Sequence, residues 1–234
     1  MKAIFKRELS AYFTSPIGYI YLGITLLISG WFFVSTNLYY AISDMSYFFS
    51  NMTFVLIFMV PMLTMRLFSE EMRNKTDQLL LTAPVTVTQI VLGKFLSAAA
   101  FFGISLLITL IYPLVMLLYG DPLIMTVLGL YIGFLLLGAS LISIGVFVSS
   151  VTESQVTAAI ISFVVMMFIW LADWISSTVN NAVIKQIFDW LSVLKRYQEF
   201  TTGILSLSSV VYFISFASVF VFLTVQTIEK KRWS

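Results

Sequence analysis

The feature that most constrains this chain is a series of six apolar stretches, each long enough to cross a lipid bilayer as a helix. A membrane-crossing helix needs about 20 mostly apolar residues. The predicted spans are 17–38, 48–67, 91–119, 123–148, 156–175 and 207–228. Only 10% of the 234 residues are charged, whereas soluble domains carry about 25%. The sequence therefore predicts an all-α integral membrane protein, with a single transmembrane domain over residues 1–234.

The positions of Lys and Arg predict how the chain is oriented in the membrane. With the N-terminus inside, ten of the 13 basic residues fall on the inner side. They are Lys2, Lys6, Arg7, Arg66, Arg73, Lys75, Lys94, Lys230, Lys231 and Arg232. Only Lys185, Lys195 and Arg196 fall on the outer side. Because cytoplasmic loops carry an excess of Lys and Arg, both termini are predicted to be cytoplasmic.

Two further segments are predicted to lie at the membrane surface. Residues 1–15 place apolar side chains on one helical face and basic ones on the other, which indicates a helix in the inner interface. A plain positively charged anchor is the alternative for this segment. Residues 176–206 are predicted to form interfacial or re-entrant helices on the outer side, with a break near Lys195 and Arg196. A surface helix that caps the bundle is the alternative there.

The sequence lacks several residue types and motifs on which catalysis commonly depends. The chain has no cysteine and no histidine, so thiolate chemistry and the commonest general base are excluded. It has no G-x-x-x-x-G-K-[ST] loop to bind nucleotide phosphates and no carboxylates clustered at metal-ligand spacing. Its net charge of +2 gives no case for nucleic-acid binding. We therefore expect a protein that is not an enzyme and that itself binds no cofactor or metal.

The predicted spans also lack the ionisable groups on which ion-coupled transport depends. Residues 95–120 and 122–152 carry no charge at all, and neither do residues 200–228. Secondary transporters place such groups deep in their spans to relay protons or ions. The sequence thus disfavours ion coupling but leaves a passive pore open.

A charged segment between the second and third spans stands out against this background. A helix is predicted over 68–83, with Phe68, Met72, Leu79 and Leu80 on one stripe. Pro84 ends this helix, and Thr86 with Gln89 forms a capping-box pattern that starts the next one. The segment is either a rigid charged knob that transmits force from a soluble motor, or an amphipathic loop helix resting on lipid head groups.

The residues of this segment resemble those of a known family. The run EEMRNKTDQLLLTAPV over 70–85 is similar to the E-E-x-[KR]-x-x-T-x-x-L-L-x-[ST]-x-P-[VI] string of the type-2 ABC export permeases. Residues 90–95, 150–155 and 229–233 also fit the family pattern, so the resemblance covers nearly the whole chain. It looks closest to the short permeases related to the gliding-motility ABC system. Lys75 departs from the pattern, since many relatives carry glycine there.

The resemblance implies the permease subunit of an ATP-binding cassette exporter in the bacterial plasma (inner) membrane. It implies a coupling helix that docks on a separate ATPase subunit, which binds ATP and Mg²⁺, and a second permease copy, identical or paralogous. The residues implied to line the ATPase contact are Glu70, Glu71, Arg73, Thr76, Asp77, Leu80 and, in the second inner loop, Glu153. The alternatives are an ATP-driven mechanotransducer without cargo flux, and a stand-alone channel or secondary transporter.

Overall fold

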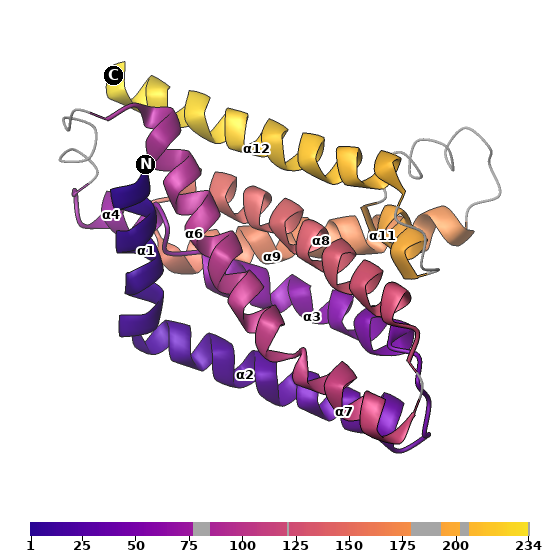
Figure 1. Cartoon of the computed structure of the whole chain (residues 1–234). Helices are drawn as coiled ribbons and strands as arrows, with labels where there is room; N and C mark the ends of the chain where they lie inside the picture. The colour runs from indigo at the N-terminus through magenta and orange to yellow at the C-terminus, as the bar shows by residue number, and fades with distance from the viewer. Residues whose placement is uncertain (77–84, 121, 179–192, 202–205, 234) are drawn as a thin grey trace.

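A computed structural model describes residues 1–76, 85–120, 122–178, 193–201 and 206–233, and every regular element in those ranges is a helix (Figure 1). The helices are α1 (Lys2–Thr14), α2 (Pro16–Phe33) with a π-helical end (Val34–Leu38), α3 (Ser46–Thr64), α4 (Ser69–Arg73), α6 (Val87–Ile108), α7 (Ile111–Tyr119), α8 (Ile124–Val151), α9 (Gln155–Thr178), α11 (Val193–Thr201) and α12 (Leu207–Trp233). Six helical stretches in the described residues are long and apolar enough to cross a membrane: Pro16–Leu38, Ser46–Arg73, Val87–Leu118, Ile124–Val151, Gln155–Ala172 and Leu207–Arg232. The prediction of an all-helical chain with six such helices is confirmed.

Proline sets the boundary between the first two helices. Ser15 adopts an extended conformation, as expected for the residue before Pro16. Pro16 occupies the start of α2, where its missing N–H costs nothing, and the Ser15 side chain accepts a hydrogen bond from the Gly18 N–H. The chain therefore turns sharply from α1 into the first span.

The third span is interrupted, which the sequence analysis did not anticipate. α6 ends at Ile108 and α7 begins at Ile111, with tighter hydrogen bonds across Thr109 and Leu110. Pro113 lies four residues beyond Thr109. Because proline lacks an N–H and its ring clashes with the carbonyl four residues earlier, a continuous α-helix through this point is disfavoured.

The centre of the bundle is formed by α3 and α8, most of whose residues are buried, whereas less than a third of the described residues of α2, α9 and α12 are buried. α8 packs against α3, α6, α9, α11 and α12. Two glycines of α8 allow close approaches of its neighbours, because a Cβ at Gly138 would collide with the Phe102 ring and one at Gly145 with Thr64. Small residues permit such close helix packing in a membrane, where apolar burial against lipid gives little driving force.

Different helices lie at the two ends of the bundle. Figure 1 shows α1 lying across one end, where α4 and both chain termini also lie. At the other end α11 packs against α8 with Tyr197 and Phe200 buried. α11 is continuous through Lys195 and Arg196 and begins at Val193, so a break near these two residues stays a prediction for the segment that precedes α11. The remainder of the predicted outer hairpin, 179–192 and 202–205, lies outside the described residues.

Candidate functional site

The charged segment after α3 forms a short helix at the end of the bundle that also carries α1. α4 places Glu70 and Glu71 in its first turn and Arg73 in its last turn, which complements the helix dipole at both ends. The helix ends at Arg73, whereas the sequence predicts helix as far as residue 83. Lys75 adopts a left-handed conformation with φ of 55°, and the Thr76 N–H donates to the Glu71 carbonyl at 2.9 Å. These are the features of a Schellman cap, which closes a helix.

The predicted contact residues are divided by the fold into two groups. Glu70, Arg73 and Thr76 are exposed, as is Glu153 in the connection between α8 and α9. Glu71 instead points into the protein, with its side chain 17% exposed. Asp77 and Leu80 lie outside the described residues. Since α4 packs against both α8 and α9, the two predicted inner loops meet at the same end of the bundle.

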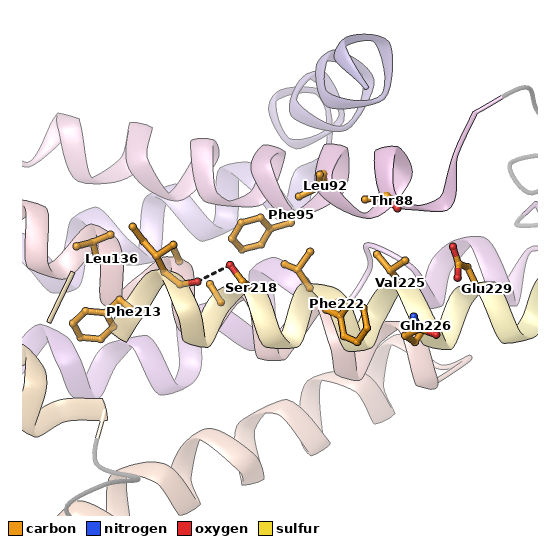
Figure 2. Close-up of a pocket in the computed structure, with 14 residues that line it drawn as sticks. Thr88, Leu92, Phe95, Leu136, Phe213, Ser218, Phe222, Val225, Gln226 and Glu229 are labelled. Carbon is orange, nitrogen blue, oxygen red and sulfur yellow. Dashed lines mark hydrogen bonds between the residues drawn. The ribbon is translucent and has the colours of Figure 1, made fainter. Parts of the chain in front are cut away.

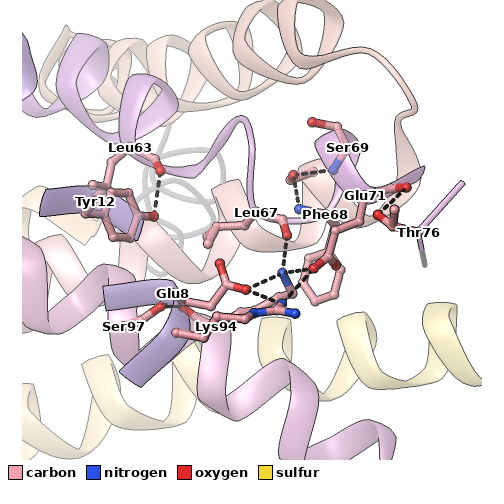
Figure 3. Close-up of polar contacts among 12 residues, drawn as sticks. Glu8, Tyr12, Leu63, Leu67, Phe68, Ser69, Glu71, Thr76, Lys94 and Ser97 are labelled. Atoms are coloured by element: carbon pink, nitrogen blue, oxygen red, sulfur yellow. Dashed lines mark hydrogen bonds and ion pairs between the residues drawn. The ribbon is translucent and has the colours of Figure 1, made fainter. Parts of the chain in front are cut away.

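Glu71 belongs to a network of four charged side chains from three helices (Figure 3). Its Oε1 atom lies 3.0 Å from Lys94 Nζ of α6 and 2.8 Å from Arg7 Nη2 of α1. Glu8 of α1 approaches the same two groups, at 3.1 Å from Lys94 and 2.5 Å from Arg7. Lys94 Nζ also donates to the Leu67 carbonyl at 2.6 Å.

The network compensates for the burial of Lys94, whose side chain is only 1% exposed. A buried ammonium is costly unless it is paired and hydrogen-bonded. Burial also opposes ionisation of Glu8, but the charge of Lys94 and hydrogen bonds from Arg7 and Lys94 outweigh it and lower the pKa of Glu8. Partial burial likewise opposes the charge on Arg7, yet hydrogen bonds and charges of Glu8 and Glu71 raise its pKa. Glu8 and Arg7 are therefore held in their charged forms at neutral pH.

A serine on α8 caps the start of α4. Ser149 Oγ accepts hydrogen bonds from the backbone N–H groups of Phe68 at 3.1 Å and Ser69 at 3.2 Å. It also donates to the Met65 carbonyl at 3.2 Å. The first N–H groups of a helix have no partner within the helix, so Ser149 supplies one from a different span. The basic C-terminus adds a further tie, since Lys231 Nζ donates to the Ser150 carbonyl at 2.9 Å.

A charged recess of about 430 Å³ lies between α1, the end of α3 and α4. Arg66 forms part of its wall, donating to Ser15 Oγ at 2.7 Å and stacking over the Tyr12 ring. The Tyr12 hydroxyl is buried and donates to the Leu63 carbonyl at 2.9 Å. Carboxylates and basic groups lie side by side in the recess, so its surface is neither uniformly negative nor uniformly positive.

A second hollow is apolar and lies between α6, α8 and α12, with a volume of about 570 Å³. Figure 2 shows Leu92 and Phe95 of α6 facing Phe222 and Val225 of α12. Three of its polar residues, Thr88, Gln226 and Glu229, lie near one end, and Ser218 lies farther along the hollow. A hollow of this size and polarity suits a hydrocarbon chain better than a polar substrate.

Several residues of the site were missed by the sequence analysis. Arg7 and Lys94 were counted only as orientation signals, and Glu8 and Ser149 were assigned no role in the site. Lys94 did carry a usable signal, because an isolated cation two turns inside an apolar helix needs a buried partner. Among the residues that the structure describes, no cluster of three or more acidic, His or Cys side chains could hold a metal ion.

Comparison with known proteins identifies one family. The family described as "ABC-2 family transporter protein" matches residues 33–228 of this chain. The match includes all predicted contact residues of both inner loops, but it begins after α1. No curated protein matches the chain.

Proposed function

This chain belongs to the ABC-2 transporter family, and from that premise we propose that it is the permease subunit of an ATP-driven exporter. Membership of the family makes it a membrane component of an ABC transporter and implies an ATPase partner. In our proposal the partner binds ATP and Mg²⁺, and the chain works as a dimer with an identical or paralogous copy. The assembly exports its substrate across the bacterial inner membrane.

The observation that carries this proposal is the division of α4 into a fixed side and a free side. Glu71 is held by Arg7 and Lys94 within the protein. Glu70 and Arg73 remain exposed on the same short helix. A charged surface on a rigid support suits docking of a soluble subunit, because charges across an interface determine orientation and exclude wrong partners.

The proposed mechanism moves the spans through this surface. Closure of two ATPase subunits on ATP displaces α4 in each permease copy. Binding energy can shift the permease between inward- and outward-open states only if the ATPase binds the two states differently. The contact at Glu70, Arg73, Thr76 and Glu153 therefore has to change between the states.

The first prediction concerns the free side of α4. The double substitution Glu70→Lys/Arg73→Glu reverses two exposed charges and should lower recovery of the ATPase about tenfold, which corresponds to about 1.4 kcal/mol. The measurement is affinity purification of the tagged chain from native membranes in mild detergent. The ATPase is identified by its phosphate-loop sequence and by photolabelling with azido-ATP.

Lys6→Ala is the matched control, because Lys6 is an exposed charge on α1 outside the network. It should leave recovery of the ATPase unchanged. Equal recovery from the charge-reversed variant would refute the assigned contact. Flux without any co-purifying ATPase would favour a stand-alone channel or secondary transporter, and nucleotide-dependent movement without flux would favour a mechanotransducer.

A further inference from the structure

The ammonium group of Lys94 joins three separate parts of the chain. Glu8 of α1, the Leu67 carbonyl after α3, and Glu71 of α4 each place one oxygen within 3.1 Å of Nζ. A lysine ammonium has three N–H donors. Two of these donors bond to Glu8 and to the Leu67 carbonyl, Glu71 forms an ion pair with the same ammonium, and the Phe68 ring lies 5.1 Å away.

Other contacts hold α1 against its neighbours. A Cβ at Gly93, next to Lys94, would lie 3.0 Å from Ile4 Cγ2, so a larger residue there would require the Ile4 side chain to shift. Tyr12 and Arg66 tie the other half of α1 to the end of α3. Because Ser15 leads directly into α2, any displacement of α1 is passed to the first span.

Arg7 closes the network on its exposed side. It bridges Glu8 of α1 and Glu71 of α4, with a side chain 54% exposed. A half-exposed ion pair of this kind contributes little to the stability of the fold by itself. The buried contacts of Lys94 are the ones that cannot be broken without leaving a charge uncompensated in the interior.

We infer that Lys94 is a positioning residue that joins α1, α4 and the start of α6 into one rigid unit. This inference rests on the proposed function and extends it. A displacement of α4 by the ATPase is delivered through Lys94 to the third span and through α1 to the first span. α1 is then part of the force-transmitting machinery and is more than a membrane anchor.

Apolar packing alone would not achieve the same coupling. Replacing a buried ion pair with well-packed apolar groups is often neutral or favourable for stability. Apolar contacts are non-directional, so helices joined only by them can slide or rotate. Two hydrogen bonds and one ion pair around a single ammonium, to Leu67, Glu8 and Glu71, restrict both the separation and the orientation of the segments that carry these groups.

The test uses spin-label distances, which the absence of native cysteine makes straightforward. Labels are placed at Ser10→Cys on α1 and Asn74→Cys after α4, both exposed positions. The purified chain should give one narrow distance distribution, and the complex with its ATPase should give the same distribution with and without ATP. Lys94→Gln should broaden it, and transport per ATP hydrolysed should fall about tenfold while ATPase recovery stays at the wild-type level.

Two variants separate positioning from general stability. Lys94→Arg keeps the charge and several donors, so it should restore a substantial part of the coupling. Ser97→Ala removes a buried hydroxyl that donates only to the Lys94 carbonyl of its own helix, and it should leave distances and coupling unchanged. If Lys94→Gln does not fold, Glu8→Gln removes one arm of the network and should broaden the same distribution.

The two readouts distinguish failure of the inference from failure of the proposed function. A narrow distribution and normal coupling in Lys94→Gln, or in Glu8→Gln where that variant replaces it, would overturn the inference while leaving the exporter intact. If no ATPase is recovered with the wild-type chain, the proposed function fails. The distance distribution of the chain alone then still shows whether Lys94 holds α1 to α4.

Discussion

At the scale of single residues, Lys75 is the clearest conflict between local preference and fold. Its left-handed backbone, with φ of 55°, closes α4 and turns the chain away from the helix axis. A side chain in this conformation places its Cβ too close to the following carbonyl, at a cost of about 1–2 kcal/mol. The glycine of the family pattern, from which Lys75 departs, would take this conformation without the penalty.

Replacing this residue with glycine should stabilise the protein. Lys75→Gly is expected to raise the free energy of unfolding by about 1 kcal/mol, since it removes the steric conflict while keeping the cap. The measurement is an SDS unfolding titration of the purified chain in mixed micelles. Lys75→Ala is the control, because it removes the charge but keeps the Cβ. If both variants raised the free energy of unfolding equally, the effect would come from loss of the Lys75 charge and not from the backbone conformation.

At the scale of secondary structure elements, α4 depends on α8 for its first turn. Five residues are too few for a helix that is stable by itself. Its first N–H groups are satisfied by Ser149, 80 and 81 residues away in the sequence. The ion pair between Glu71 and Lys94 holds one face of α4 against α6. The left-handed backbone of Lys75 ends the helix. The position of α4 is therefore determined by the spans around it.

Removal of the Ser149 hydroxyl should loosen α4. Ser149→Ala leaves two buried backbone N–H groups without their acceptor, which costs about 1–3 kcal/mol. We expect faster trypsin cleavage after Arg73 and Lys75 in the folded protein, followed by mass spectrometry. Ser150→Ala is the neighbouring control, because the Ser150 hydroxyl donates only to the Phe147 carbonyl of its own helix. Cleavage at the wild-type rate in Ser149→Ala would contradict the assigned cap.

At the scale of the whole molecule, the charged groups of the candidate site gather at one end of the bundle. The end that carries α1, α4 and both termini also carries the charge network and the two predicted inner loops (Figure 1). The excess of Lys and Arg at this end predicts that it faces the cytoplasm. The apolar hollow between α6, α8 and α12 has Thr88, Gln226 and Glu229 near one end, and that part of its lining comes from the first residues of α6 and the last residues of α12.

Labelling of single cysteines tests this orientation. Tyr40→Cys lies beyond the end of the first span and Glu153→Cys lies between α8 and α9, and both positions are exposed. A membrane-impermeant maleimide should label Tyr40→Cys in intact spheroplasts. It should label Glu153→Cys only after permeabilisation. The reverse pattern would place the charge network outside the cell and remove the basis for contact with a cytoplasmic ATPase.

Much of the fold and part of the site could be predicted from short-range patterns. The six apolar helices follow from the length of the apolar runs, and the cap at Thr86 follows from a three-residue spacing, since Thr86 Oγ1 accepts from the Gln89 N–H. The exposed positions of Glu70 and Arg73 agree with a helix that has a polar face. The interruption of the third span before Pro113 could also have been predicted, because its cause lies within four residues.

The sequence by itself determined that this chain is a helical membrane protein, and that its charged segment lies between the second and third spans. These features depend on neighbours in the chain, namely apolar run length, caps and prolines. Only the tertiary structure decided that Glu71 points inward while Glu70 stays free, and that Lys94 joins α1 to α4. Those outcomes depend on partners up to 86 residues apart, and the direction of a side chain toward such a partner is set by helix packing, which no local pattern encodes.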